Sequence, residues 1–99
     1  SAASDVYKRQ AFLCPLGASA RDACVTLLAQ LRESGVSADM DYTGRKLKAM
    51  LEQADRIRAR NAVILGDSEL AEGIAQVRNM TTKEQTPVPL KELAQALLM

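Results

Sequence analysis

The sequence has no histidine and no tryptophan, and its aromatic residues are two tyrosines and one phenylalanine. Without histidine the chain cannot build a Ser-His-Asp or a Cys-His catalytic group. With so few aromatics the core must be aliphatic, and a hydrophobic content of 47% can supply one core for a chain of 99 residues. No run of about 18 apolar residues occurs, so we expect no membrane span and a cytoplasmic protein.

Cysteine and glycine are also scarce. Cys14 and Cys24 have no histidine to complete a zinc site with them, and we expect no bound metal. Both cysteines fall in apolar segments, so we expect them to be reduced core residues. The five glycines are isolated from one another, so the sequence contains no glycine-rich loop of the kind that binds phosphate. The acidic residues at 67–72 lack a partner base, and we therefore predict no catalytic residue.

Hydrophobic periodicity predicts an α/β domain with the order β-α-β-α-β-β-β-α. The expected strands are at 11–16, 36–40, 62–65, 74–79 and 86–88. The expected helices have apolar stripes at 20–31, 47–57 and 90–98, with Ser19 as the N-cap of the first. Parallel strands joined by such helices require crossovers that place helices on both faces of the sheet. Ligands of such sheets favour the carboxyl ends of the strands, here the loops at 16–19, 41–45 and 66–69.

The charges are unevenly distributed. Between residues 45 and 60 there are six basic and two acidic residues, a net of +4, whereas the only charges at 61–77 are three acidic residues. A basic helix therefore precedes an acidic loop. The basic face is either a merely solvated surface or a set of contacts for phosphate groups.

The most informative segment is the apolar run at 62–65, which ends in Gly66 and is followed by Asp67 and Glu69. Arg78 follows on the next expected strand, and we expect Glu69 and Arg78 to lie near each other at the edge of the sheet. An acceptor-only carboxylate and a multi-donor guanidinium can together read the hydrogen-bonding edge of a nucleobase. Alternatively, the two side chains form a structural salt bridge.

These residues, together with Asp41-Tyr-Thr-Gly-Arg-Lys-Leu-Lys48, resemble the anticodon-binding domain of class IIa aminoacyl-tRNA synthetases. The resemblance runs from about Phe12 to the end of the chain, with several blocks in the right order. The segments at 41–48, 53–55 and 81–85 are similar to the histidyl branch. The threonyl, prolyl and glycyl branches usually carry a proline before the third strand, where this chain has Arg60-Asn61. Arg58 departs from the histidyl pattern, in which glycine is common.

The resemblance implies a three-layer α/β/α fold with a five-stranded mixed sheet in the order 2-1-3-4-5, strand four being antiparallel. It also implies that Glu69 and Arg78 read anticodon bases of histidine tRNA. Tyr42 and Gly44 lie in the block where the family approaches the anticodon loop closely. A further set of basic side chains suits phosphate contacts, which position RNA without reading its sequence: Arg45, Lys46 and Lys48.

In functional terms, the resemblance implies the C-terminal domain of a histidyl-tRNA synthetase, an enzyme that joins histidine to its tRNA with ATP. The catalytic motifs of that enzyme are not in this sequence, so we expect no catalysis and no cofactor here, with ATP and magnesium bound by the missing catalytic domain. The full-length enzyme is expected to be a homodimer. The alternatives are the equivalent domain of a threonyl, prolyl or glycyl enzyme, and a regulatory or dimerisation module without tRNA charging.

The start of the chain is expected to stand apart from this domain. Asp5-Val-Tyr-Lys-Arg-Gln10 resembles the translation of a transposase adapter used in sequencing libraries, which makes residues 1–10 a non-native segment and 11–99 the anticodon-binding domain. The alternative is an ordinary disordered tail or linker. Either interpretation excludes residues 1–10 from the fold.

Overall fold

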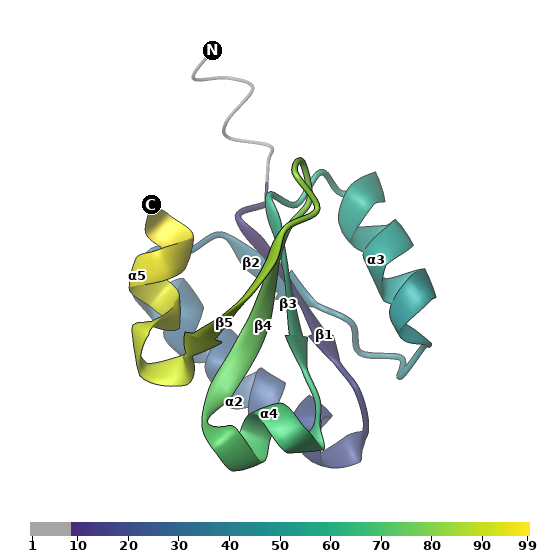
Figure 1. Ribbon diagram of the computed structural model, residues 1–99, viewed down its shortest axis with the longest axis vertical. Coiled ribbons are helices and arrows are strands. Elements are labelled where there is room, and N and C mark those ends of the chain that lie inside the picture. Colours follow the sequence, from purple (N-terminus) through teal and green to yellow (C-terminus); the bar gives the residue numbers. More distant parts are fainter. Residues whose placement is uncertain (1–8) are drawn as a thin grey trace.

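The structure, a computed structural model, describes residues 9–99 and consists of one mixed sheet between two layers of helices (Figure 1). The strands are β1 (Ala11–Pro15), β2 (Ala38–Met40), β3 (Asn61–Leu65), β4 (Ile74–Asn79) and β5 (Gln85–Pro89). The helices are α2 (Ala18–Glu33), α3 (Leu47–Arg56), α4 (Asp67–Glu72), the short 3₁₀ turn η1 (Leu90–Glu92) and α5 (Leu93–Leu98). The strand order is β2-β1-β3-β4-β5. β1 is parallel to β2 and β3, whereas β4 is antiparallel to both of its neighbours, which confirms the predicted topology.

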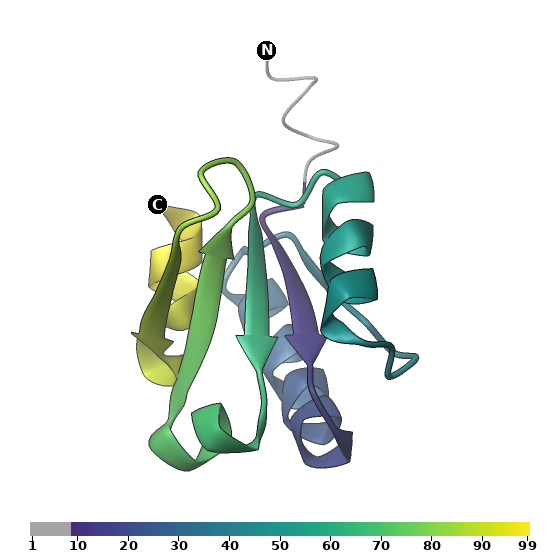
Figure 2. The same ribbon diagram turned by 45° about the vertical axis from the view of Figure 1, so that its right-hand side comes forward.

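Each face of the sheet carries its own apolar cluster. Because side chains alternate along a strand, Ala11 and Leu13 of β1 join the cluster under α2 and α5, whereas Phe12 and Cys14 join the cluster under α3. Two helices cover the first face, but α3 covers only part of the second. Figure 2 shows that no helix formed by residues 9–99 lies over the α3 side of β4 and β5, and the first three residues of β5 are exposed. The part of this sheet face formed by β4 and β5 is therefore left open by the helices of the described chain.

The structure has helices and strands at the predicted apolar segments, with two corrections to the helices. α2 begins at Ala18 with Gly17 as its N-cap and without a side-chain cap, so the predicted Ser19 cap is wrong. The expected loop at 66–69 opens a helix, α4. With six residues, α4 is too short to show a helical period; its own capping contacts and the packing of Leu70 against the core cluster stabilise it.

Both cysteines lie in the core, as predicted, with Cys14 in the cluster under α3 and Cys24 in the cluster under α2. Burial raises the pKa of each thiol to about 12, so both are protonated and unreactive near neutral pH. In the part of the chain from residue 9 to 99, no helix combines the length and apolar character needed to cross a membrane.

Arg9 and Gln10 continue the sheet before β1. The Gln10 amide donates to the Ser37 carbonyl (2.8 Å), and Gln10 Oε1 accepts from the Ser37 amide (2.7 Å). On the other side, the Arg60 amide donates to the Arg9 carbonyl (2.9 Å). The expectation that residues 1–10 take no part in the fold is therefore wrong for these two residues, while 1–8 lie outside the described residues.

Candidate functional site

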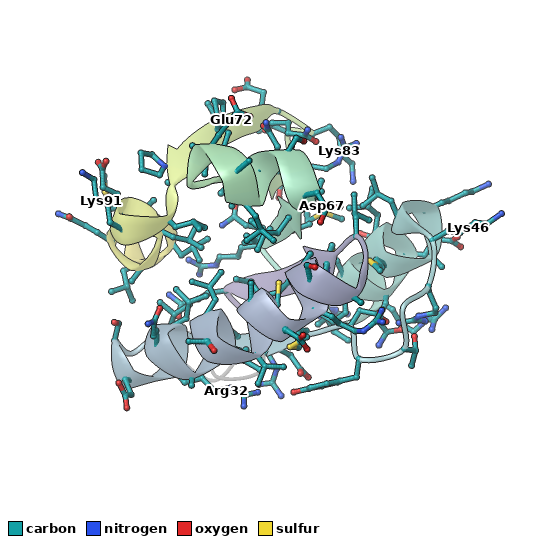
Figure 3. The ribbon with its side chains drawn as sticks, turned by 90° about the horizontal axis from the view of Figure 1, so that it is seen from below. Arg32, Lys46, Asp67, Glu72, Lys83 and Lys91 are labelled. Carbon is teal, nitrogen blue, oxygen red and sulfur yellow. The ribbon has the colours of Figure 1, made fainter. Side chains whose placement is uncertain are left out.

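The carboxyl ends of the parallel strands meet at one edge of the sheet, shown at the bottom of Figure 1. The loop after β2 and the start of α4 both lie at this edge, as predicted from the sequence. Figure 3 views this edge directly, with Asp67 at the start of α4 and Lys46 pointing outward at the start of α3. Two of the blocks that carry the family resemblance therefore lie together at this edge.

The loop at 41–45 is built around the carboxylate of Asp41, which is 2% exposed. Asp41 Oδ1 accepts from Thr43 Oγ1 (3.0 Å) and Arg45 Nε (3.0 Å), and Asp41 Oδ2 accepts from the Gly44 amide (3.0 Å). The Arg45 guanidinium completes an ion pair at 2.9 Å. Burial alone would raise the pKa of Asp41, but the hydrogen bonds from Arg45 and Thr43 outweigh it and hold the pKa below its usual value.

The structure shows how the two predicted base-contacting residues of this loop, Tyr42 and Gly44, are placed. Tyr42 is 61% exposed, so its ring is accessible for stacking. Gly44 has φ +72°, and a Cβ built on it would lie 2.5 Å from Arg21 Nη1. The space that glycine leaves is therefore occupied by Arg21, a residue that the sequence reasoning missed. Asp41 was also missed as the centre of the loop, although a carboxylate four residues before an arginine was a signal for this pair.

Glu69 and Arg78 do not come together. Arg78 pairs with Ala62 at the start of β3, whereas α4 follows the other end of that strand. β4 begins at Ile74, just after the C-cap Gly73 of α4, and Arg78 lies about 13 Å further along the strand. Figure 1 shows α4 at one edge of the sheet and the turn between β4 and β5 at the other. The predicted proximity is wrong, and the two residues form no ion pair with each other.

Glu69 makes its contacts within its own helix. Its Oε1 accepts from the Gly66 amide (2.9 Å), and its Oε2 accepts from Ser68 Oγ (3.3 Å). The carboxylate thus caps the first turn of α4, where it also complements the helix dipole.

Arg78 lies instead in a groove of about 210 Å³ between α3 and β4. It lies on the same sheet face as its partner Ala62, which is the face that α3 leaves partly open. The groove brings together residues that the sequence does not place side by side; its lining is Lys48, Leu51, Glu52, Asp55, Arg78, Met80 and Lys83. Lys48, a predicted phosphate contact, thus joins Arg78, and Lys83 from the β4–β5 turn adds a third cation that the sequence reasoning missed.

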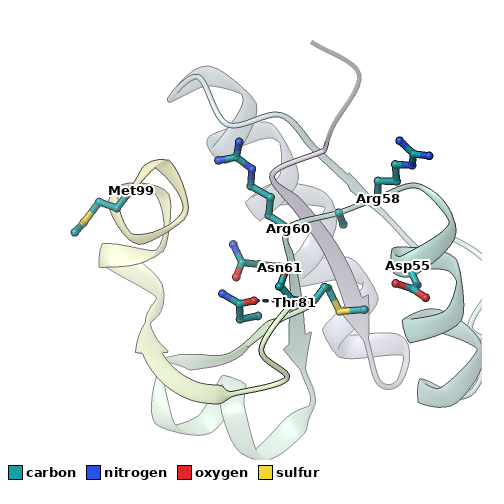
Figure 4. Close-up of a pocket in the computed structure, with 9 residues that line it drawn as sticks. Asp55, Arg58, Arg60, Asn61, Thr81 and Met99 are labelled. Carbon is teal, nitrogen blue, oxygen red and sulfur yellow. Dashed lines mark hydrogen bonds between the residues drawn. The ribbon is translucent and has the colours of Figure 1, made fainter. Parts of the chain in front are cut away.

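A larger hollow of about 540 Å³ lies by the amino end of β3 and the carboxyl end of β4, and it shares Asp55 and Met80 with the groove at Arg78. Figure 4 shows Asp55, Arg58, Arg60, Asn61, Thr81 and Met99 around it, and none of the predicted site residues lines it. The larger of the two hollows is therefore not the one that contains predicted site residues.

Comparison with known proteins agrees with this architecture. The chain is 49% identical to a histidine–tRNA ligase of Halalkalibacterium halodurans over 83% of its length, which is 19% of that protein. It superposes on apo histidyl-tRNA synthetase of S. aureus with a TM-score of 0.88 and 35% identity, covering 94% of this chain and 24% of that chain. The RNA binding domain of a threonyl-tRNA synthetase from Cryptosporidium parvum shares the fold, with a TM-score of 0.83 and 16% identity over 91% of this chain and 23% of that chain.

The chain spans about a fifth of the length of the curated relatives it matches. The resemblance read from the sequence is confirmed by the similarity to histidine–tRNA ligases and by the match to a family. The family is described as "Anticodon binding domain", and its model covers residues 10–98. The chain therefore belongs to the anticodon binding domain family.

Proposed function

We propose that this chain binds the anticodon loop of histidine tRNA and is one part of a histidine–tRNA ligase. The observation that carries the proposal is the 49% identity to such a ligase over 83% of the chain. Joining histidine to tRNA would be the work of the longer protein, since the chain corresponds to about a fifth of its relatives. A cytoplasmic location and a homodimeric full-length enzyme belong to the same proposal, and sedimentation of the full-length protein tests the dimer.

The groove at Arg78 supports base recognition. The bases of an anticodon loop are single-stranded and can be splayed out, so side chains can reach their Watson–Crick edges. The guanidinium of Arg78 offers a planar set of donors on an open sheet face, with Lys48 and Lys83 beside it for the backbone. Glu69 lies at the other end of the strand pair, so we assign the two residues to different bases rather than to the two sides of one base.

The edge formed by the loop at 41–45 supports contacts that do not depend on sequence. Tyr42 is exposed and can stack on a base, which any base allows. Lys46 points outward beside it and suits a phosphate. The exposed edge and the groove at Arg78 share α3, which begins at the first and forms a wall of the second.

An Arg78→Ala variant tests this proposal. We expect it to lose about 1–3 kcal/mol of discrimination between the histidine anticodon and altered anticodons, the usual value of a bidentate base contact. Arg78→Lys should restore little, because an ammonium group lacks the planar fork. The measurement is the dissociation constant of anticodon stem-loop RNAs that differ only in the anticodon.

Lys46→Glu provides the matched control, since it should weaken binding to all of these RNAs alike. Unchanged discrimination in folded Arg78→Ala protein would contradict the role of Arg78. Failure of the parent chain to bind any of the RNAs would favour a regulatory or dimerisation module instead.

A further inference from the structure

Two arginines reach the loop at 41–45, and only one of them is held by a carboxylate. Arg45 Nε and Nη2 lie 3.0 and 2.9 Å from Asp41 Oδ1. These contacts direct the Arg45 guanidinium back toward its own loop. Arg45 was predicted from the sequence to contact phosphate, but its geometry shows a side chain that holds the loop together.

The second arginine is Arg21, which reaches the loop from the first turns of α2. A Cβ on Gly44 would lie 2.5 Å from Arg21 Nη1 and 3.4 Å from Arg21 Cζ, so the guanidinium lies against the exposed backbone of Gly44. The absence of a side chain at Gly44 thus makes room for a cation of the protein itself. Any molecule that approaches Gly44 meets Arg21.

The surroundings of Arg21 leave its charge available. Among residues 9–99, no carboxylate forms an ion pair with Arg21, and the first turn of α2 holds no acidic residue. Tyr42 and Thr43, which precede Gly44 in the loop, are exposed. A guanidinium held at a surface without a carboxylate partner matches the geometry and charge of a phosphate group.

We infer that Arg21 is the arginine that contacts an RNA phosphate at this edge, and that Arg45 is a positioning residue that shapes the loop through Asp41. The inference rests on the proposed function, because it names a further contact for the same RNA. The sequence had given the phosphate contact to Arg45, and the inference gives it to Arg21. Arg21 lies outside the segments that carry the family resemblance, so the sequence did not point to it.

The test uses the full chain and an anticodon stem-loop RNA of histidine tRNA, with binding measured at several salt concentrations. Arg21→Gln is expected to weaken binding about fivefold at low salt and to lower the slope of log affinity against log salt by roughly 0.7–1. Arg21→Lys should keep most of the affinity, because a phosphate contact needs the charge more than the fork. Neither variant should change the melting temperature, since Arg21 makes no ion pair within residues 9–99.

Arg32→Gln is the matched control. Arg32 lies near the other end of the same helix, where its Nε donates to the Ala38 carbonyl at the start of β2, so we expect RNA binding to remain unchanged. Equal losses in the Arg21→Gln and Arg32→Gln variants, or no loss in Arg21→Gln, would overturn the inference alone. So would an Arg21→Lys variant that binds as weakly as Arg21→Gln. A parent chain without salt-dependent RNA binding would overturn the proposed function as well.

Discussion

Asp41 is the charged residue that folding buries most completely among residues 9–99. A buried carboxylate is tolerated only when hydrogen bonds replace the water it has lost, and Asp41 receives them from Thr43, Gly44 and Arg45. These donors follow Asp41 directly in the chain. One side chain therefore organises the whole loop and fixes where Tyr42 and Gly44 stand.

Replacing this carboxylate should destabilise the domain. We expect Asp41→Ala to lower the free energy of unfolding by about 2–3 kcal/mol, because several donors, one of them charged, lose their acceptor. Urea unfolding measures the change. Asp39→Ala is the control: Asp39 is 39% exposed and 3.8 Å from Arg32, so its pair should contribute at most about 1 kcal/mol. Equal effects of the two substitutions would show that the loop does not depend on Asp41.

The same carboxylate predicts a pH dependence. Its pKa in the folded chain is lowered from the ordinary value of 3.8, so folding favours the charged form. The stabilisation is complete above the ordinary value and is lost as the pH falls through the lower, folded value. We expect the parent chain to lose stability on acidification from pH 5 more steeply than Asp41→Asn, which has no such proton to bind. Parallel curves for the two proteins would contradict this assignment.

At the scale of single elements, α4 shows how one residue can serve two purposes. Glu69 Oε1 accepts from the Gly66 amide as a helix cap, and we propose from the family resemblance that the carboxylate also accepts from an anticodon base. A capping position accepts Gln as well as Glu, because either side chain offers an oxygen. A base contact does not, because the amide adds donors where only acceptors stood.

Glu69→Gln therefore separates the two roles. We expect its melting temperature to remain close to that of the parent, while discrimination among anticodons falls. Glu69→Ala should in addition lower the free energy of unfolding by about 1 kcal/mol, the usual value of a cap. Thermal unfolding and RNA binding are to be measured on the same preparations. If the Glu69→Gln variant still discriminated among anticodons, Glu69 would have a capping role and no base contact.

The end of α3 carries a strained residue. Arg58 follows the C-cap Ile57 with φ 60°, and its amide donates to the Asp55 carbonyl while the Ala59 amide donates to Ala54. This is the left-handed turn that closes many helices, and glycine favours it. The departure from the family pattern at Arg58 thus leaves the turn in place at an energetic cost.

Arg58→Gly should therefore stabilise the domain. A non-glycine residue pays roughly 1–2 kcal/mol in the left-handed region, and the greater freedom of glycine in the unfolded chain offsets part of the gain. We expect a net increase of about 0.5–1 kcal/mol in the free energy of unfolding, measured with urea. Arg56→Gly, at the last residue of α3, is the control and should be destabilising, because its backbone is helical and glycine is a poor helix former.

At the scale of the whole molecule, the fold could be predicted further than the site. The hydrophobic periodicity predicted the five strands, because five apolar or alternating runs leave few other ways to bury the apolar side chains. The family resemblance added the order of these strands in the sheet. The position of Arg78 relative to Glu69 could not be read this way. Arg78 follows Glu69 by nine positions in the sequence. The first of these positions lie in α4, and the others run along β4 to the opposite end of the strands, where Arg78 lies. The presence of α4 and the direction of β4 decide that distance, and the apolar period of the sequence shows neither of them.

The boundary of the domain gives the last prediction. Arg9 and Gln10 hydrogen-bond to Ser37 on one side and to Arg60 and Asn61 on the other, which joins the parallel strands at their amino ends. A chain that begins at Ala11 should therefore be less stable by about 2 kcal/mol than a chain that begins at Arg9, because several hydrogen bonds of about 0.5–1.5 kcal/mol are lost. Urea unfolding of the two truncated chains measures this difference directly. Equal stability would return Arg9 and Gln10 to the segment outside the fold, where the sequence alone had placed them.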